Sequence, residues 1–244
     1  MSSGYYAACA GLRAQTEALD LIANNLANVN TPGYRSQDAA FQSLLAGSYT
    51  ARADPLSNVV NDFNAMASTH LQMQSGNLQQ TGNPLDLAIK GPGFFAVQTP
   101  AGTMYTRDGN FQVSARGQLI TARGEPVLGA TGPITLPAGE LTFSPDGTIS
   151  TNGAVAGQVR IVEFKPGARL VAEGNSLYSV SANGVQPSPS SSLRQGELEA
   201  SNVDPVRAVV SLIMTQRQAE MMERCMSTFE SDFDHIAAND LPKV

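Results

Sequence analysis

The sequence is poor in the side chains that perform acid–base catalysis or bind metal ions. Its 244 residues include only two histidines, His70 and His235, which lie far apart and are more typical of surface or packing residues than of bases or ligands. Asp62 and Asp204 come from separate segments, so they do not indicate the close carboxylate pair that acid–base chemistry uses. We therefore predict no catalytic residue and no metal site.

One glycine-rich segment matches a cofactor-binding pattern. Gly91, Gly93 and Ala96 have the spacing of the dinucleotide-binding motif, in which a helix directly after the glycines holds the pyrophosphate at its N-terminus. Residues 94–98 instead continue as an apolar strand toward Pro100. Because the required helix is missing from the pattern, we interpret these glycines as a turn. We expect no cofactor and no enzymatic activity.

Charged residues are scarce, at 15% of the chain, against about 25% in an ordinary soluble protein. The 15 basic and 21 acidic residues give a net charge of -6, with no basic run, which disfavours nucleic acid as a partner. So little charge gives weak mutual repulsion and favours self-association. The uninterrupted apolar stretches are too short for a membrane span or a signal-peptide core. We expect no direct membrane insertion and no cleaved signal peptide.

Two long helices are predicted at the ends of the chain. The apolar residues of a heptad pattern recur near the N-terminus: Leu12, Leu19, Ile22, Leu26 and Val29. They predict a helix over residues 3–29 that ends before Pro32. Asp204 and Pro205 supply an N-cap and a first helical position for a second helix. This helix reaches about Ala238, and its apolar row includes Met222, Met226, Phe229 and Phe233.

The second helix has a further apolar face near its start. This face consists of Val203, Val206, Val210 and Ile213. Even if the two terminal helices pair within one chain, these side chains stay uncovered, and a lone amphipathic helix is only marginally stable in water. Other copies of the chain are the simplest cover, and head-to-tail contacts that do not close produce a helical filament. The apolar rows of both helices are therefore the predicted subunit interface.

Between the terminal helices the apolar period changes from seven to two. Residues 85–89 alternate, and several short strands separated by Asp-Gly, Asn-Gly and Arg-Gly turns follow. We predict an α+β fold, in which long N- and C-terminal helices form a coiled-coil-like terminal domain and flank a central mainly-β module. The predicted parts are an N-terminal helix and Asn-rich motif (1–35), a linker (36–80), the β module (81–195) and the C-terminal helix (196–244).

The two cysteines lie one on each predicted helix. If the helices pair antiparallel, Cys9 falls within one turn of Cys225, so a disulfide is geometrically conceivable. The alternative is that both are small apolar residues at helix-packing positions.

Three blocks of sequence resemble the bacterial flagellar rod and hook protein family. The first block is ANNLANVNTPGYR, residues 23–35. The second is GNPLDLAI at residues 82–89, with Gly91, Gly93-Phe94-Phe95 and YTRDG at residues 105–109. The third is LEASNV at residues 198–203, followed by Thr215-Gln216-Arg217. The blocks come in the family's order and span nearly the whole chain, so the resemblance is specific.

The resemblance implies a structural subunit of the flagellar basal-body rod. Such a subunit is exported without a cleaved signal peptide by the flagellar type III export apparatus. It assembles with its own copies and with other rod proteins in the periplasm, and its terminal helices line a hollow shaft that transmits torque from motor to hook. A single compact β module leaves no room for the extra domains of a hook subunit. Residues 124–134 are most similar to proximal-rod members, with distal-rod members as the alternative.

Four asparagines near the end of the first predicted helix have two interpretations. They are Asn24, Asn25, Asn28 and Asn30. Their amides can satisfy the backbone groups that a helix end leaves unpaired, or they can form a hydrogen-bonded junction between subunits. The resemblance favours the junction. It also implies an aromatic residue where this chain has Ala219, so one helix contact is expected to differ.

Two other classes of function compete with the rod subunit. One is an enzyme built on the β module, with the helices as an oligomerisation device; it predicts activity in residues 81–195. The other is a secreted coiled-coil adhesin or tail-fibre subunit. That class predicts uninterrupted heptads and a cleaved signal peptide, and the sequence has neither.

Overall fold

The structure is a computed structural model of the chain, and it divides into two compact units. The residues that it describes are 2–39, 69–165, 167–168, 170–180, 184–188 and 190–240. Unit 1 holds the described residues of 1–27, 37–70 and 204–244, and unit 2 those of 28–36 and 71–203. The chain therefore passes between the units at four places. Residues 40–68, most of the predicted linker, lie outside the described residues.

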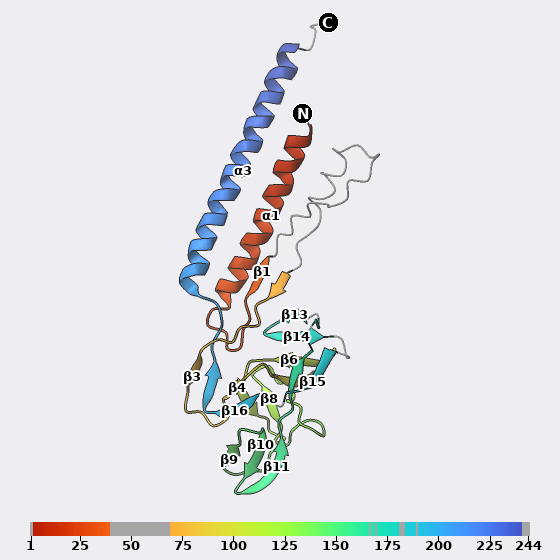
Figure 1. The fold of residues 1–244 in the computed structure, drawn as a ribbon, viewed down its shortest axis with the longest axis vertical. Helices are drawn as coiled ribbons and strands as arrows, with labels where there is room; N and C mark the ends of the chain where they lie inside the picture. Colours follow the sequence, from red (N-terminus) through yellow and green to blue (C-terminus); the bar gives the residue numbers. More distant parts are fainter. Residues whose placement is uncertain are drawn as a thin grey trace. The chain divides into compact units, whose positions relative to one another are not determined.

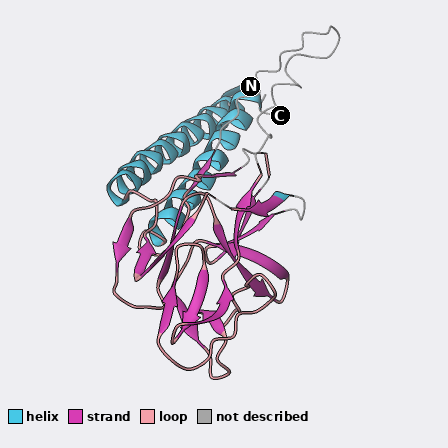
Figure 2. Cartoon of the chain, turned by 60° about the horizontal axis from the view of Figure 1, so that its bottom comes forward, coloured by secondary structure: helices cyan, strands magenta, loops and turns pink. Residues whose placement is uncertain are grey.

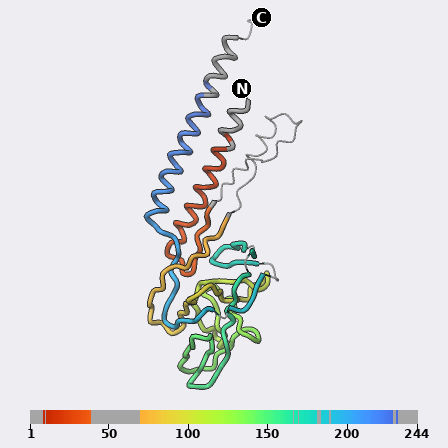
Figure 3. The backbone as a smooth tube through the Cα atoms, in the orientation of Figure 1, coloured from red at the N-terminus to blue at the C-terminus, as the bar shows by residue number. Residues whose placement is uncertain are grey.

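Unit 1 contains two helices, α1 (Ser2–Ala27) and α3 (Pro205–Asp240), which pack side by side and run in opposite directions (Figure 1). The side chain of Asp204 caps α3, because its Oδ1 accepts hydrogen bonds from the backbone N–H groups of Val206 at 3.0 Å and Arg207 at 3.1 Å. This confirms the predicted start of the C-terminal helix. Figure 3 follows the same backbone as a tube.

A short strand pair completes the described part of unit 1. Strand β1 (Gln37–Ala39) pairs with β2 (Thr69–Leu71). Asn25, near the end of α1, fastens the helix to β1. Its Nδ2 donates to the carbonyl of Gln37 at 2.8 Å, and its Oδ1 accepts from the N–H of Gln37 at 2.9 Å. One amide side chain thus pairs with both the N–H and the carbonyl group of Gln37.

The predicted fold class is wrong. The described chain is mostly β structure around a six-stranded sheet. The helices are the smaller part: their described side chains form one run of 17 residues near the N-terminus and one of about 24 near the C-terminus. The most buried described positions of the helices are Asn25, Thr215 and Ala219. A coiled-coil seam needs large apolar side chains there. The seven-residue spacing therefore marked two amphipathic helices and not a coiled-coil domain.

Unit 2 is built from short antiparallel strands (Figure 2). The six-stranded sheet has the order β13-β14-β6-β5-β12-β15, and three strands form a second sheet in the order β11-β10-β9. Three pairs accompany them, β16-β4, β17-β3 and β7-β8. The strands are β3 (Leu78–Gln80), β4 (Leu87–Lys90), β5 (Phe94–Thr99), β6 (Gly102–Thr106), β7 (Phe111–Val113), β8 (Leu119–Thr121), β9 (Leu141–Phe143), β10 (Thr148–Thr151), β11 (Ala154–Gln158), β12 (Ile161–Phe164), β13 (Leu170–Gly174), β14 (Leu177–Val180), β15 (Val185–Pro187), β16 (Ser192–Gln195) and β17 (Glu197–Glu199).

Strand β5 separates two apolar clusters. Phe95 and Val97 belong to the larger cluster, whereas Phe94 and Ala96 belong to a second one with Tyr178. Successive side chains of a strand point to opposite faces of the sheet, so the continuous apolar run of β5 is buried on both faces. This run is the segment that resembled the start of a dinucleotide motif, and no helix follows the glycines.

Three further observations concern unit 1 or the described chain as a whole. Cys9, which is half-buried, and Cys225, which is exposed, are both free thiols. Within the described ranges, neither helix is both long and apolar enough to cross a bilayer. The described residues also contain no group of three or more acidic, histidine or cysteine side chains that could hold a metal ion.

Candidate functional site

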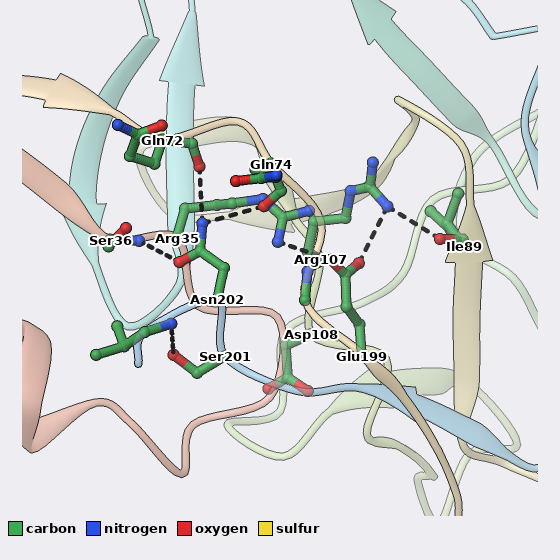
Figure 4. Close-up of polar contacts among 12 residues, drawn as sticks. Arg35, Ser36, Gln72, Gln74, Ile89, Arg107, Asp108, Glu199, Ser201 and Asn202 are labelled. Carbon is green, nitrogen blue, oxygen red and sulfur yellow. Dashed lines mark hydrogen bonds and ion pairs between the residues drawn. The ribbon is translucent and has the colours of Figure 1, made fainter. Parts of the chain in front are cut away.

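Three distant segments of unit 2 meet at one carboxylate, that of Glu199 at the end of β17. Arg35 contributes Nη1 at 2.6 Å from Oε1 of Glu199, and Arg107, which follows β6, contributes Nη1 at 3.1 Å from Oε2 (Figure 4). The three side chains are each 1% exposed or less. We call Arg35, Arg107 and Glu199 the ionic cluster.

Arg107 is the more fully bonded of the two arginines. It also donates through Nη1 to the carbonyl of Ile89 at 3.0 Å and through Nη2 to the carbonyl of Gly91. Its guanidinium lies 4.8 Å from the ring centroid of Phe94, a cation–π contact. Burial lowers the pKa of Arg107 to about 10, and Glu199 opposes this shift. Arg107 is therefore charged at neutral pH, and it holds the turn between β4 and β5.

The ionic cluster has two guanidinium groups and one carboxylate. Nε and Nη2 of Arg35 have no hydrogen-bond partner among the described residues. The nearby Tyr178 hydroxyl accepts a hydrogen bond from the backbone N–H of Arg35 at 3.1 Å. Burial raises the pKa of Tyr178 to about 12, so this phenol does not supply a second negative charge at neutral pH. Among the described side chains, Glu199 is the carboxylate that pairs with both arginines.

Asn202, three residues after Glu199, joins its own segment to residues 34–36 and 72–74 through neutral hydrogen bonds. Its Oδ1 accepts from the N–H of Ser36 at 2.7 Å, and its Nδ2 donates to the carbonyls of Gln72 at 3.1 Å and Gln74 at 3.0 Å (Figure 4). Its own N–H donates to the carbonyl of Tyr34 at 3.3 Å. All polar atoms of this amide side chain are thus bonded to backbone groups of two other segments.

Two glycines let these backbones approach. The N–H of Gly33 donates to the carbonyl of Glu199 at 2.7 Å, and the N–H of Gly76 donates to its Oε1 at 2.9 Å. A Cβ on Gly76 would lie 1.9 Å from the carbonyl oxygen of Ala200. Gly33 has a φ of 66°, and a Cβ there would lie 2.3 Å from the carbonyl carbon of Arg107. Neither position can carry a side chain without moving backbone.

The predicted interface residues lie in several environments. Val206, Val210 and Ile213 on α3 are exposed, by 71%, 45% and 47%. Eight of the predicted residues are half-buried: Leu12, Leu19, Ile22, Leu26, Val29, Val203, Met222 and Met226. The side chains of Phe229 and Phe233 lie outside the described residues.

The four asparagines also differ in their exposure. Asn24 and Asn30 are exposed, whereas Asn25 is buried and bonded to Gln37, as described above. Asn28 is half-buried and accepts a hydrogen bond from Oγ1 of Thr31 at 3.2 Å. Neither of these bonds pairs a backbone group at the end of α1, so the helix-end interpretation and the subunit junction both stay predictions.

The predicted site residues did not include the ionic cluster. Arg35, Arg107 and Glu199 each stand in one of the three blocks that resembled the flagellar family, and the structure brings these blocks together. The available signal was a charged residue in each block, basic in the first two cases and acidic in the third. The cluster has no exposed acid or base and no reactive group, so its chemistry is that of holding segments together.

Three family models match separate parts of the chain. "Flagella basal body rod protein" matches residues 6–35, "Flagellar hook protein FlgE/F/G D1 domain" matches residues 88–156, and "Flagellar basal body rod FlgEFG protein C-terminal" matches residues 194–238. The first and third matches include Arg35 and Glu199, and the second includes Arg107.

Curated relatives match over nearly the whole chain. The flagellar basal-body rod protein FlgF of Mesorhizobium japonicum is 36% identical over 240 residues, covering 96% of each chain. FlgF of Caulobacter vibrioides is 33% identical, over 93% of this chain and 92% of the relative. The rod protein FlgG of Borreliella burgdorferi is 32% identical, over 95% and 96%.

Proposed function

The chain belongs to the family of flagellar basal-body rod proteins, and we propose that it builds the rod by packing the apolar faces of its two helices against neighbouring subunits. As a member of this family it is a structural protein and not an enzyme, it is part of the flagellar basal body, and it assembles with other rod proteins. Its immediate partners are further copies and related rod subunits.

The observation that carries this proposal is the uncovered apolar face of α3. Six large apolar side chains of this helix are between 41% and 71% exposed: Val206, Val209, Val210, Ile213, Met214 and Met221. A monomeric soluble protein rarely exposes so many on one element, and such a patch indicates an interaction surface. The opposite row of α3, with Thr215 and Ala219, is buried within unit 1. The helix therefore has one face for its own chain and one for a neighbour.

Contacts between unlike faces of identical or related subunits give a ring when the rotation between neighbours closes and an open helix when it does not. A rod requires the open helix. In this proposal Leu12, Leu19, Ile22 and Leu26 of α1 and the exposed row of α3 form the inner wall of a hollow shaft. The shaft transmits torque from motor to hook. The subunit reaches the periplasm through the flagellar type III export apparatus without a cleaved signal peptide, and it occupies the proximal rod.

Substitution of the exposed face tests this proposal. Ile213→Asp, expressed as the only copy in the host bacterium, should abolish swimming and remove the subunit from purified basal bodies, since a carboxylate would be buried unpaired in the interface. The purified variant should unfold at the same temperature as the wild type. Ser211→Asp, at an exposed position of α3 outside the row of large apolar side chains, is the matched control and should swim normally. Normal rods containing Ile213→Asp would rule the face out as an interface.

A distal position in the rod is the alternative, because FlgG proteins also match at 32–33% identity. Imaging of basal bodies that carry a labelled copy of the chain distinguishes the two positions. A label beside the motor supports the proximal rod, and a label beside the hook supports the distal rod.

A further inference from the structure

The four connections between the units are anchored in unit 2 by a small set of residues. The chain crosses between residues 27 and 28, 36 and 37, 70 and 71, and 203 and 204. On the unit 2 side, these crossings are carried by three segments, residues 28–36, 71–76 and 199–203. We call them the first, second and third connecting segments.

All three connecting segments meet next to their crossings. Ser36 is the last residue of the first segment, and its carbonyl accepts a hydrogen bond from the N–H of Gln72 at 2.9 Å. Asn202 of the third segment binds the N–H of Ser36 and the carbonyls of Gln72 and Gln74. Every crossing is therefore followed or preceded, within a few residues, by a bond to another connecting segment.

Glu199 of the third segment also binds the first and second segments, through its carboxylate. Its Oε1 binds Arg35 of the first segment at 2.6 Å and the N–H of Gly76 of the second at 2.9 Å. Its Oε2 binds Arg107 of the β module at 3.1 Å. Departure of the third segment would leave two buried guanidinium groups with no carboxylate, and such uncompensated burial is strongly destabilising. Partial release is therefore unfavourable.

We propose that Glu199 and Asn202 form a latch that makes release of the three connecting segments all-or-none. In the latched state, unit 2 holds the ends of all four crossings together. When the latch opens, the first, second and third segments lose their hydrogen bonds together while the sheets of unit 2 stay folded. This conformational device is a property of the single chain, so it does not depend on the proposed assembly.

Hydrogen exchange on the full-length chain tests the latch, because a perturbation in one segment can be read in another. Arg35→Met removes a first-segment partner of Glu199 and leaves the N–H of Gly76 able to bind the same carboxylate. The amides of Gln72 and Gly76 should then exchange at least about tenfold faster, to the same degree as that of Ser36, which corresponds to about 1.4 kcal/mol. The amides of β10 should be unchanged. Arg13→Met, an exposed arginine of unit 1, is the control and should alter neither segment.

A variant in the second segment tests whether a perturbation there also reaches the first segment. Gly76→Ala forces a Cβ against the carbonyl of Ala200 in the third segment, and it should accelerate exchange at Ser36 as well. Faster exchange confined to the substituted segment would overturn the latch. Equal acceleration in β10 would also overturn it, since release would then be global unfolding. If Arg35→Met does not fold, Arg35→Lys is the milder variant: it keeps the charge but loses the guanidinium geometry, so it should accelerate the same amides to a smaller degree.

Discussion

Arg35 and Glu199 form an ion pair of 2.6 Å between Nη1 and Oε1, with both side chains 1% exposed or less. Arg35 lies between α1 and β1, and Glu199 ends β17 shortly before α3. The pair therefore joins the segment that follows α1 to the segment that precedes α3. Arg107 binds the other oxygen of the same carboxylate at 3.1 Å. The geometry therefore links the family's N-terminal, central and C-terminal blocks at one buried point.

Glu199→Gln should destabilise the protein more than any single substitution of its partners. It leaves two buried guanidinium groups uncompensated, and breaking a buried pair in this way costs about 3–5 kcal/mol. Arg35→Met should cost less, since Arg107 and Glu199 remain as a neutral pair. Urea unfolding measures both differences.

The exposed Glu17, whose pair with Arg13 lies at the surface of α1, provides the control. Glu17→Gln should change the free energy of unfolding by less than about 0.5 kcal/mol. A smaller loss for Glu199→Gln than for Arg35→Met would contradict the assignment of Glu199 as the shared counter-charge.

Part of this structure could be predicted from local sequence. Asp204 and Pro205 mark the start of α3 because capping depends on neighbouring residues only. The coiled-coil prediction failed for a physical reason. The spacing of Leu12, Leu19 and Leu26 is compatible with any amphipathic helix over a few turns, and the seam depends on which side chains of α3 face them.

The ionic cluster could not be predicted from the sequence pattern. Arg35, Arg107 and Glu199 each look like an ordinary charged residue in its own segment, and nothing local says which of the chain's other charges it will meet. The pairing of β16 with β4 brings Glu199 near Arg107, which also binds Ile89 of β4. The hydrogen bond from Gly33 to the carbonyl of Glu199 brings in the segment of Arg35. Buried charge is specified by topology, and topology depends on contacts between distant segments.

Gly109→Ala should destabilise unit 2 by about 1–3 kcal/mol or more, because a new side chain in a tight space forces backbone shifts. A Cβ at this position would lie 1.6 Å from the carbonyl oxygen of Leu87, whose N–H donates to the carbonyl of Gly109 at 3.0 Å. Thermal unfolding followed by circular dichroism measures the loss.

Gly157, in β11, is the matched control. No atom lies within 4 Å of its Cβ position, and its φ is not in the left-handed region. Gly157→Ala should be neutral or stabilising by up to about 1 kcal/mol, through lower entropy of the unfolded chain. Equal losses for the two variants would mean that the approach of residue 109 to Leu87 is not the cause.

Asp108 and Asp146 should change the pH dependence of stability in opposite directions. Burial, with a contribution from Asp86, raises the pKa of Asp108, whereas hydrogen bonds from Thr148 lower the pKa of Asp146. The folded state therefore binds a proton at Asp108 more tightly than the unfolded chain does. Its stabilising effect is complete below the unfolded pKa and is lost as the pH rises through the folded value. For Asp146 the effect is present above the unfolded pKa and is lost as the pH falls.

Urea unfolding between pH 3 and pH 7 separates the two aspartates. Relative to the wild type, Asp108→Asn should gain stability as the pH rises, and Asp146→Asn should lose it. The difference for Asp146→Asn should level off toward neutral pH, where a lowered pKa leaves that carboxylate ionised in both states. Curves that shift in the same direction would show that burial does not control Asp108.

Ala219→Phe should loosen the packing of α1 against α3. Ala219 is 9% exposed. Gly11 of α1 lies next to Met222 of α3, since a Cβ on Gly11 would meet Cε of Met222 at 3.6 Å. Because Ala219 is buried, a phenyl ring in its place should overpack the contact between the helices, at a cost of about 1–3 kcal/mol. Far-UV circular dichroism during thermal unfolding reports the helices, and the helical transition should shift to lower temperature.

Gln216→Phe, on the exposed surface of α3, is the control. It adds the same ring without displacing a neighbour and should leave the transition in place. An unchanged transition in Ala219→Phe would mean that the space beside Ala219 accepts an aromatic ring, as the resemblance to its family implies for other members.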